Sequence, residues 1–332
     1  RADDKLLFDR RVTLNLVVQA TSNNFDESVL IDYLDLTKYG VTQKDLLDFK
    51  SFFEHANVFG ALIQIPLDFE VRLPAIRKLS TIDEQNIFVT ESLRHLKALV
   101  HQAEFLISKH DAIVTNPPFM ASKYQPAILK KYLKLHYNGY DKDLFSAFID
   151  RAFNFSKNNA YFGFMTPFVW MFISTHQNLR KRLIDQENIK SLIQLEYSGF
   201  DGATVPVCTF TLNRNNVNNQ KGSYIRLADF RGSDNQGPKA LQAINDNKCG
   251  WYYEISQDNF NKIPGSPLAY WLSEQALKLY DNHPLLGSIA AARPGLSTTN
   301  NDLFIRYWYE VSYNNTGYGI DSSDAAKASE YK

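Results

Sequence analysis

The residues best suited to chemistry in this sequence are Asn116, Pro117, Pro118 and Phe119. They directly follow a short apolar run, 112–114, which we expect to be a buried strand of a parallel sheet. The two prolines lack N–H groups and fix φ, and each disfavours the α region for the residue before it. We therefore expect a stiff, extended exit from the strand that holds neighbouring groups in place.

Such an exit suits a reaction at the exocyclic amine of a nucleobase, which is a poor nucleophile because its lone pair is delocalised. The side-chain oxygen of Asn116 and the carbonyl of Pro117 can each accept one amine hydrogen and aim the lone pair at an electrophile, without a general base. Phe119 would lie against the face of the base, which must first be flipped out of a duplex. The alternative is a rigid surface turn, because Asn-Pro is a common turn dipeptide.

Composition limits the classes of function. A length of 332 residues predicts about two domains. The 36 Lys and Arg residues balance 36 Asp and Glu residues, so any contact with nucleic acid needs a local basic patch. Cys208 and Cys249 are far apart and the histidines are scattered, so we expect neither a disulfide nor a metal site. No apolar run reaches the roughly 20 residues of a membrane span and no signal peptide is visible, which predicts a soluble, cytoplasmic protein.

Strands and helices alternate around residues 116–119, which we call the Asn116 segment, and this alternation predicts an α/β fold. A short Gly-containing loop joins two strands after a βαβαβ series, so one antiparallel strand should lie in a mostly parallel sheet. The stretch 58–65 fits either a helix or a strand, and the aromatic face of 144–153 should be core. The expected strands are 11–19, 160–165, 189–195, 205–212 and 223–228, and the expected helices are 30–36, 44–54, 93–109, 144–153 and 178–185.

Two further segments bear on function. The connection 120–141 is rich in Lys and Tyr, so its lysines could contact phosphates, although a solvated helix explains them equally well. The run 231–238 contains Gly, Ser, Asn, Asp and Pro and is the best candidate for a linker, so we expect a domain boundary at 235.

The segment 115–119, Thr-Asn-Pro-Pro-Phe, resembles the catalytic motif (Asn/Asp/Ser)-Pro-Pro-(Tyr/Phe) of S-adenosylmethionine-dependent amino-methyltransferases. Together with the opening 1–4 and with Gly-Leu-Ser-Thr-Thr-Asn-Asn-Asp-Leu-Phe at 295–304, it resembles the PglX-type adenine-specific DNA methyltransferases of BREX phage-defence systems, which are related to type IIG restriction-modification enzymes. The resemblance implies the C-terminal part of a Rossmann-like class I methyltransferase sheet. On this basis 1–235 is the catalytic domain without its N-terminal cofactor-binding strands, and 236–332 is a connector and the beginning of a DNA target-recognition domain.

The resemblance also implies roles for single residues. Asn116 and Pro117 fall on the amine-binding positions and Phe119 on the stacking position, and Pro118 belongs to the same catalytic motif. Phe200 falls near a second aromatic that lies against the flipped base, with packing on the core as the alternative. The candidate DNA contacts are Lys123, Lys130, Lys131, Arg293, Asn300 and Asn301.

The implied cofactor is S-adenosylmethionine, and the implied partners are double-stranded DNA and other phage-defence proteins. Relatives bind the cofactor with a Gly-rich turn before the catalytic motif, but only Gly40 and Gly60 precede Asp111. We therefore expect the cofactor-binding residues upstream of Arg1, in a longer protein of which this chain is an internal fragment, inactive alone. The sheet of such a fragment has an exposed edge, which predicts self-association.

Two other functions stay open. An RNA guanine or protein-glutamine methyltransferase faces the same amine problem, although the long stretch after Pro238 favours a target-recognition domain. A non-catalytic DNA-binding scaffold subunit of a defence system would keep the fold. A Gly-rich cofactor turn upstream of this chain would distinguish the enzyme from the scaffold.

Overall fold

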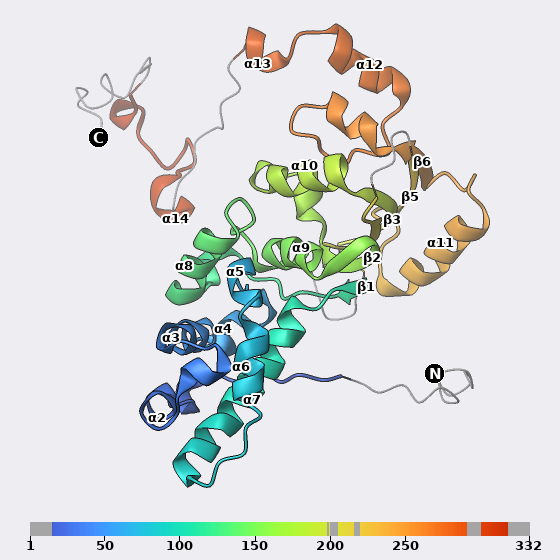
Figure 1. The fold of residues 1–332 in the computed structure, drawn as a ribbon. Helices are drawn as coiled ribbons and strands as arrows, with labels where there is room; N and C mark the ends of the chain where they lie inside the picture. The colour runs from blue at the N-terminus through green and yellow to red at the C-terminus, as the bar shows by residue number, and fades with distance from the viewer. Residues whose placement is uncertain (1–14, 198, 200–204, 216–219, 291–299, 318–332) are drawn as a thin grey trace. The chain divides into compact units, whose positions relative to one another are not determined.

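A computed structural model of the chain describes residues 15–197, 199, 205–215, 220–290 and 300–317 (Figure 1). The chain divides by its contacts into two compact units, Arg1–Asp281 and Asn282–Lys332. The first unit holds the whole described sheet and the Asn116 segment.

The elements follow one another in the order labelled in Figure 1. The strands are β1 (His110–Thr115), β2 (Ser156–Pro167), β3 (Asn188–Gln194), β4 (Val207–Asn213), β5 (Lys221–Arg226) and β6 (Tyr252–Ser256). The α-helices are α2 (Glu27–Tyr33), α3 (Gln43–Phe52), α4 (Ala56–Phe59), α5 (Leu67–Glu70), α6 (Leu73–Leu79), α7 (Ile87–Ile107), α8 (Ala127–His136), α9 (Leu144–Asn154), α10 (Gln177–Gln186), α11 (Ser233–Asn245), α12 (Glu274–Asn282), α13 (Leu286–Ile289) and α14 (Asn301–Phe304).

Within the described residues the six strands form one sheet in the order β1-β2-β4-β3-β5-β6. The pairs β1–β2 and β3–β5 are parallel, and β4 lies antiparallel between β2 and β3. Four strands, β1, β2, β3 and β5, therefore run in one direction, which confirms the predicted α/β fold with a mostly parallel sheet and the antiparallel strand near 205–212. β6 is a second antiparallel strand, paired with β5, that the sequence analysis did not predict.

One face of the sheet packs against α9 and α10. Alternate residues of β2 and β4, among them Phe162, Phe164 and Phe210, are buried in one cluster with Phe145 and Phe153 of α9. The ring centroids of Phe153 and Phe162 are 4.9 Å apart in an edge-to-face pair. The predicted aromatic core face of 144–153 is therefore confirmed.

The other face is covered at β3 and β5 by α11, which occupies the predicted linker. Gln236 explains why this Gly- and Pro-containing run is helical. Its side chain donates to the carbonyls of Phe230 and Gly232 and accepts from the N–H of Glu196 just beyond β3. These bonds fasten the start of α11 to the sheet, so most of the predicted linker 231–238 is helical.

The chain beyond 235 continues into the same compact unit. Tyr252 to Ser256 pair with β5, and Tyr270 is buried against Tyr224 with ring centroids 5.1 Å apart. The contact boundary thus lies at Asp281, and the assignment of a catalytic and a recognition part stays a prediction.

The helices before the sheet have a core of their own. The predictions 30–36, 44–54 and 93–109 correspond to α2, α3 and α7, and 58–65 is helical up to Leu62. The predicted strand 11–19 is wrong for its described part, 15–19, which has no regular structure. Its alternating pattern has no neighbouring strand to pair with among the described residues. The Gln102 side chain instead bonds both the N–H and the C=O of Ala20.

β1 lies at the edge of the described sheet, with β2 on its only paired side. Val114 is 83% exposed, so the strand and its parallel pairing are confirmed but its predicted burial is wrong. The reason is that burial depends on neighbours on both sides and both faces, which a local apolar pattern does not reveal. An edge presents unpaired backbone groups, so self-association stays a prediction.

Glu187, directly before β3, is a buried carboxyl group that gives the fold a dependence on pH. It is only 3% exposed, and its Oε2 has no hydrogen-bond partner within the described part of the chain. Burial raises the pKa of Glu187 from 4.5 to about 7, although the nearby Arg214 and Arg182 act in the opposite direction. The folded protein therefore holds a proton that the unfolded chain releases near pH 4.5.

We expect this carboxyl group to lower the free energy of unfolding as the pH rises from about 4.5 to about 7. Glu187→Gln should remove this decline. The difference in the free energy of unfolding between the variant and the wild type should then be larger above pH 7 than below pH 4.5, in favour of the variant, by on the order of 1–3 kcal/mol. Urea unfolding at a series of pH values measures the difference. Parallel pH profiles of the two proteins would contradict the assignment.

Candidate active site at the end of strand β1

The Asn116 segment begins where β1 ends. Thr115 pairs in parallel register with Phe164 of β2, and the chain then leaves the sheet through the two prolines. Pro117 is buried whereas Asn116 and Pro118 are exposed, so one proline anchors the exit while the residues on either side of it face outward. The predicted position, at the carboxyl end of a parallel strand, is confirmed.

The two side chains with predicted chemical roles are free to meet a substrate. Asn116 makes no side-chain hydrogen bond to any described residue, so its amide oxygen keeps both lone pairs for an incoming donor. Phe119 is 40% exposed and stacks on no other described ring. This arrangement is the one expected of side chains that bind a planar base.

The far end of the segment is held by Asp143, the N-cap of α9. One carboxylate oxygen accepts from the N–H of Met120 at 3.1 Å and from the N–H of Phe145 at 3.4 Å. The N–H of Leu144 in turn donates to the carbonyl of Met120 at 3.1 Å. The segment is therefore fixed by β1 before it and by α9 after it.

Burial also affects the charge on this tether. Desolvation raises the pKa of Asp143 above its ordinary value, while the backbone N–H groups of Met120 and Phe145 favour the charged form and oppose the shift. The sequence analysis missed Asp143, although an aspartate just before the apolar helix pattern of 144–153 is an N-cap signal.

The predicted phosphate contacts Lys123, Lys130 and Lys131 lie on or just before α8, which follows the segment closely in the chain. All three side chains are exposed and form no ion pair with any described residue. Lys123 lies 4.7 Å from the ring centre of Tyr124, which is itself exposed. Exposed lysines beside an aromatic ring make a surface suited to phosphates and bases.

The other predicted residues lie outside the described residues or in the second compact unit. Phe200 and Arg293 lie outside the described residues. Asn300 and Asn301 belong to the second compact unit, where the Asn300 side chain caps α14 by accepting from the N–H of Leu303. Their roles in binding DNA stay predictions.

A cavity of about 570 Å³ runs beside β1. Its lining is mainly apolar and includes Ala112, Ile113 and Val114 of the strand, Phe105 of α7 and Val17. No carboxylate lines it, and no described group of three or more His, Cys, Asp and Glu side chains is close enough to hold a metal ion. Among the described helices, none is long and apolar enough to cross a membrane.

An exposed Asn-Pro-Pro-Phe exit at the carboxyl end of a parallel strand is the site that the likeness to amino-methyltransferases predicts. The profile of the Eco57I restriction-modification methylase family matches residues 23–200, and this chain belongs to that family.

Curated relatives agree with this assignment. The adenine-specific methyltransferase PglX of Lacticaseibacillus casei (strain Zhang) is 34% identical over 222 residues, which cover 66% of this chain and 18% of PglX. The adenine-specific methyltransferase BrxX of Escherichia coli O9:H4 (strain HS) is 29% identical over 343 residues, which cover 95% of this chain and 28% of BrxX. The likeness to PglX-type proteins is therefore confirmed, and the chain spans less than a third of the length of either relative.

Among solved structures, a nuclease-deletion mutant of the Type ISP restriction-modification enzyme LlaGI in complex with a DNA substrate mimic is 12% identical, with a TM-score of 0.41. The match covers 62% of this chain and 18% of that chain.

We predict that Asp143→Ala lowers the free energy of unfolding by about 1–2 kcal/mol, because it removes a helix cap and the tether of the loop together. Asp143→Asn should cost much less, since asparagine keeps the accepting oxygen. Amide hydrogen exchange in a peptide that spans 116–122 should become faster in Asp143→Ala. Asp26→Ala, which removes the cap of α2 and no tether, should leave that exchange unchanged. Equal exchange in all variants would contradict the role of Asp143.

Proposed function

We propose that this chain is the amine-binding part of a site-specific DNA adenine N6-methyltransferase that acts in restriction-modification or phage defence. The observation that carries the proposal is the exposed side chain of Asn116, which bonds to no described residue and is held at the end of β1 by strand pairing on one side and by Asp143 on the other. Membership of the Eco57I methylase family and the likeness to PglX and BrxX support it.

The proposed chemistry is positioning of a neutral amine. The oxygens of Asn116 and Pro117 accept the two hydrogens of the adenine N6 amine, so the nitrogen lone pair points away from them towards the methyl donor. The two acceptors carry no net charge, so they draw the nitrogen towards tetrahedral geometry without removing a proton in advance. The nitrogen would bond to the methyl carbon as the bond between that carbon and the donor breaks, and it would then lose one proton to solvent.

Phe119 stacks on the flipped adenine and excludes water from one face of the ring. Its exposed fraction of 40% leaves a ring face free for this contact. Extrusion of the base costs a few kcal/mol, and stacking on an aromatic side chain returns roughly 1–3 kcal/mol. The exposed lysines of the α8 region contact phosphates of the same double-stranded DNA.

We propose S-adenosylmethionine as the methyl donor of the whole protein. Its ribose hydroxyls and its ammonium group require acceptors, for which a carboxylate is the usual partner, but the cavity beside β1 has no carboxylate in its lining. The residues that line this cavity therefore do not fit the cofactor. The described residues supply the amine-binding side of the reaction. We propose that the whole protein is cytoplasmic, as its DNA substrate is.

We expect Asn116→Ala to lower the rate of adenine methylation by the full-length protein by on the order of 10²-fold or more, because one preorganised acceptor is lost. Asn116→Asp should retain more activity, since it keeps an accepting oxygen. The assay measures methyl transfer to DNA at equal concentrations of folded protein. Asn138→Ala, an exposed asparagine elsewhere, is the matched control. Near-normal methylation by Asn116→Ala would refute the proposal.

The second prediction concerns Phe119. Phe119→Tyr should retain activity because the ring persists, whereas Phe119→Ala should lose positioning of the base. With 2-aminopurine at the target adenine, the fluorescence of bound DNA should differ between wild type and Phe119→Ala. Phe88→Ala removes an exposed ring on α7 and should behave as wild type. If Phe119→Ala gives the wild-type signal, this residue does not stack on the base.

A further inference from the structure

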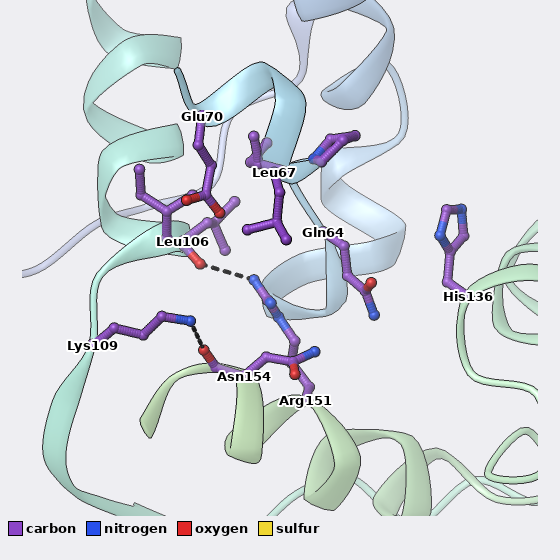
Figure 2. Close-up of a pocket in the computed structure, with 11 residues that line it drawn as sticks. Gln64, Leu67, Glu70, Leu106, Lys109, His136, Arg151 and Asn154 are labelled. Carbon is purple, nitrogen blue, oxygen red and sulfur yellow. Dashed lines mark hydrogen bonds between the residues drawn. The ribbon is translucent and has the colours of Figure 1, made fainter. Parts of the chain in front are cut away.

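A second cavity, of about 500 Å³, lies at the other end of β1 (Figure 2). Lys109, which lines it, directly precedes β1, and Asn116 directly follows the strand. Six strand residues separate them, or about 20 Å at roughly 3.3 Å per residue. The cavity is therefore distinct from the amine-binding site, and its size is typical of pockets for small molecules.

Arg151 of α9 gives the cavity a buried positive charge. It is 5% exposed, and it donates from Nε to the carbonyl of Ala61 and from Nη2 to the carbonyls of Ile63 and Leu106, at 2.7 to 2.9 Å. Figure 2 shows the bond to Leu106 at the wall of the hollow. Its Nη1 has no acceptor, and the guanidinium forms no ion pair, within the described part of the chain. This charge, which is costly to bury, is compensated by the three carbonyls, by the Phe155 ring, whose centre lies 4.1 Å from the guanidinium carbon, and at longer range by Asp150 and Glu70.

The other charged groups leave the lining with an excess of positive charge. Lys109 uses one hydrogen on the carbonyl of Asn154 and has two more to donate. Glu70 is the only carboxylate in the lining, set against the two cations Lys109 and Arg151. Desolvation lowers the pKa of His136, which favours the neutral form of this ring.

We propose that this cavity binds a small organic anion, a carboxylate or a phosphate monoester, through Nη1 of Arg151 and the ammonium group of Lys109. Both are donors with unused hydrogens, and charge-assisted bonds to an anion are the strong ones. Glu70 repels a second anionic group, so the remainder of the ligand is neutral or positively charged. This requirement excludes polyphosphates and the DNA backbone.

The place of the cavity in the fold gives binding a structural consequence. The cavity lies between the end of α7, the start of β1 and the end of α9. β1 and α9 also hold the two ends of the Asn116 segment. The 11 residues of α9 span about 16 Å, with Arg151 near the C-terminal end of the helix and Asp143 at its N-terminus. A ligand that binds only the folded state stabilises these supports.

The test uses inorganic phosphate and acetate as probes, each titrated at constant ionic strength while the thermal unfolding midpoint is recorded. The wild-type chain should show a saturable rise in the midpoint with at least one probe, and the tighter probe identifies the anionic group. Lys109→Gln should weaken the apparent affinity about tenfold, because a charge-assisted hydrogen bond is lost. Glu70→Gln should strengthen it.

Lys97→Gln is the matched control, an exposed lysine on α7 outside the cavity, and should respond as wild type. Arg151→Lys, which keeps the buried charge but not the fork of donors, should also weaken binding and serves as a second variant that retains the fold. A rise that does not saturate, or an equal response of Lys109→Gln and Lys97→Gln, would overturn the proposal.

Discussion

The Asp143 carboxylate is the contact on which the geometry of the Asn116 segment depends. It caps α9 by accepting from the N–H of Phe145 and also accepts from the N–H of Met120, so the helix and the end of the loop share one group. The prolines stiffen the segment, but stiffness alone does not fix its direction. Direction comes from the two ends, β1 and Asp143, and both come from the first compact unit.

The edge position of β1 makes this double fixation necessary. An edge strand is paired on one side only, and Val114 near its end is open to solvent on the face away from α9. A loop that leaves such a strand would move with it if nothing held its far end. The hydrogen bond from the N–H of Leu144 to the carbonyl of Met120 holds the far end of the loop, because α9 is itself buried along most of its length against the sheet.

The sequence was sufficient where the signal is local. Two consecutive prolines after an apolar run place the exit at Asn116, and the short Gly-containing loop before 205–212 predicts the antiparallel strand β4. It failed where the outcome depends on distant partners. The pattern of 11–19 needs a neighbouring strand, the burial of β1 needs cover on both sides, and the helix at 231–238 depends on Gln236 reaching Glu196. The Asp143 cap was within reach of sequence analysis, but its bond to Met120 joins residues 23 positions apart.

The distribution of charge explains how a chain with no net charge can present a surface to DNA. The 36 cations and 36 anions cancel in total, and some lysines, such as Lys50 with Glu27, form ion pairs. Lys123, Lys130 and Lys131 form none with described residues. Their positive charge is therefore unpaired among the described residues, close in the chain to a segment whose proposed acceptors are uncharged. Under the proposed function, salt would screen the attraction to phosphates without altering the neutral contacts that orient the amine.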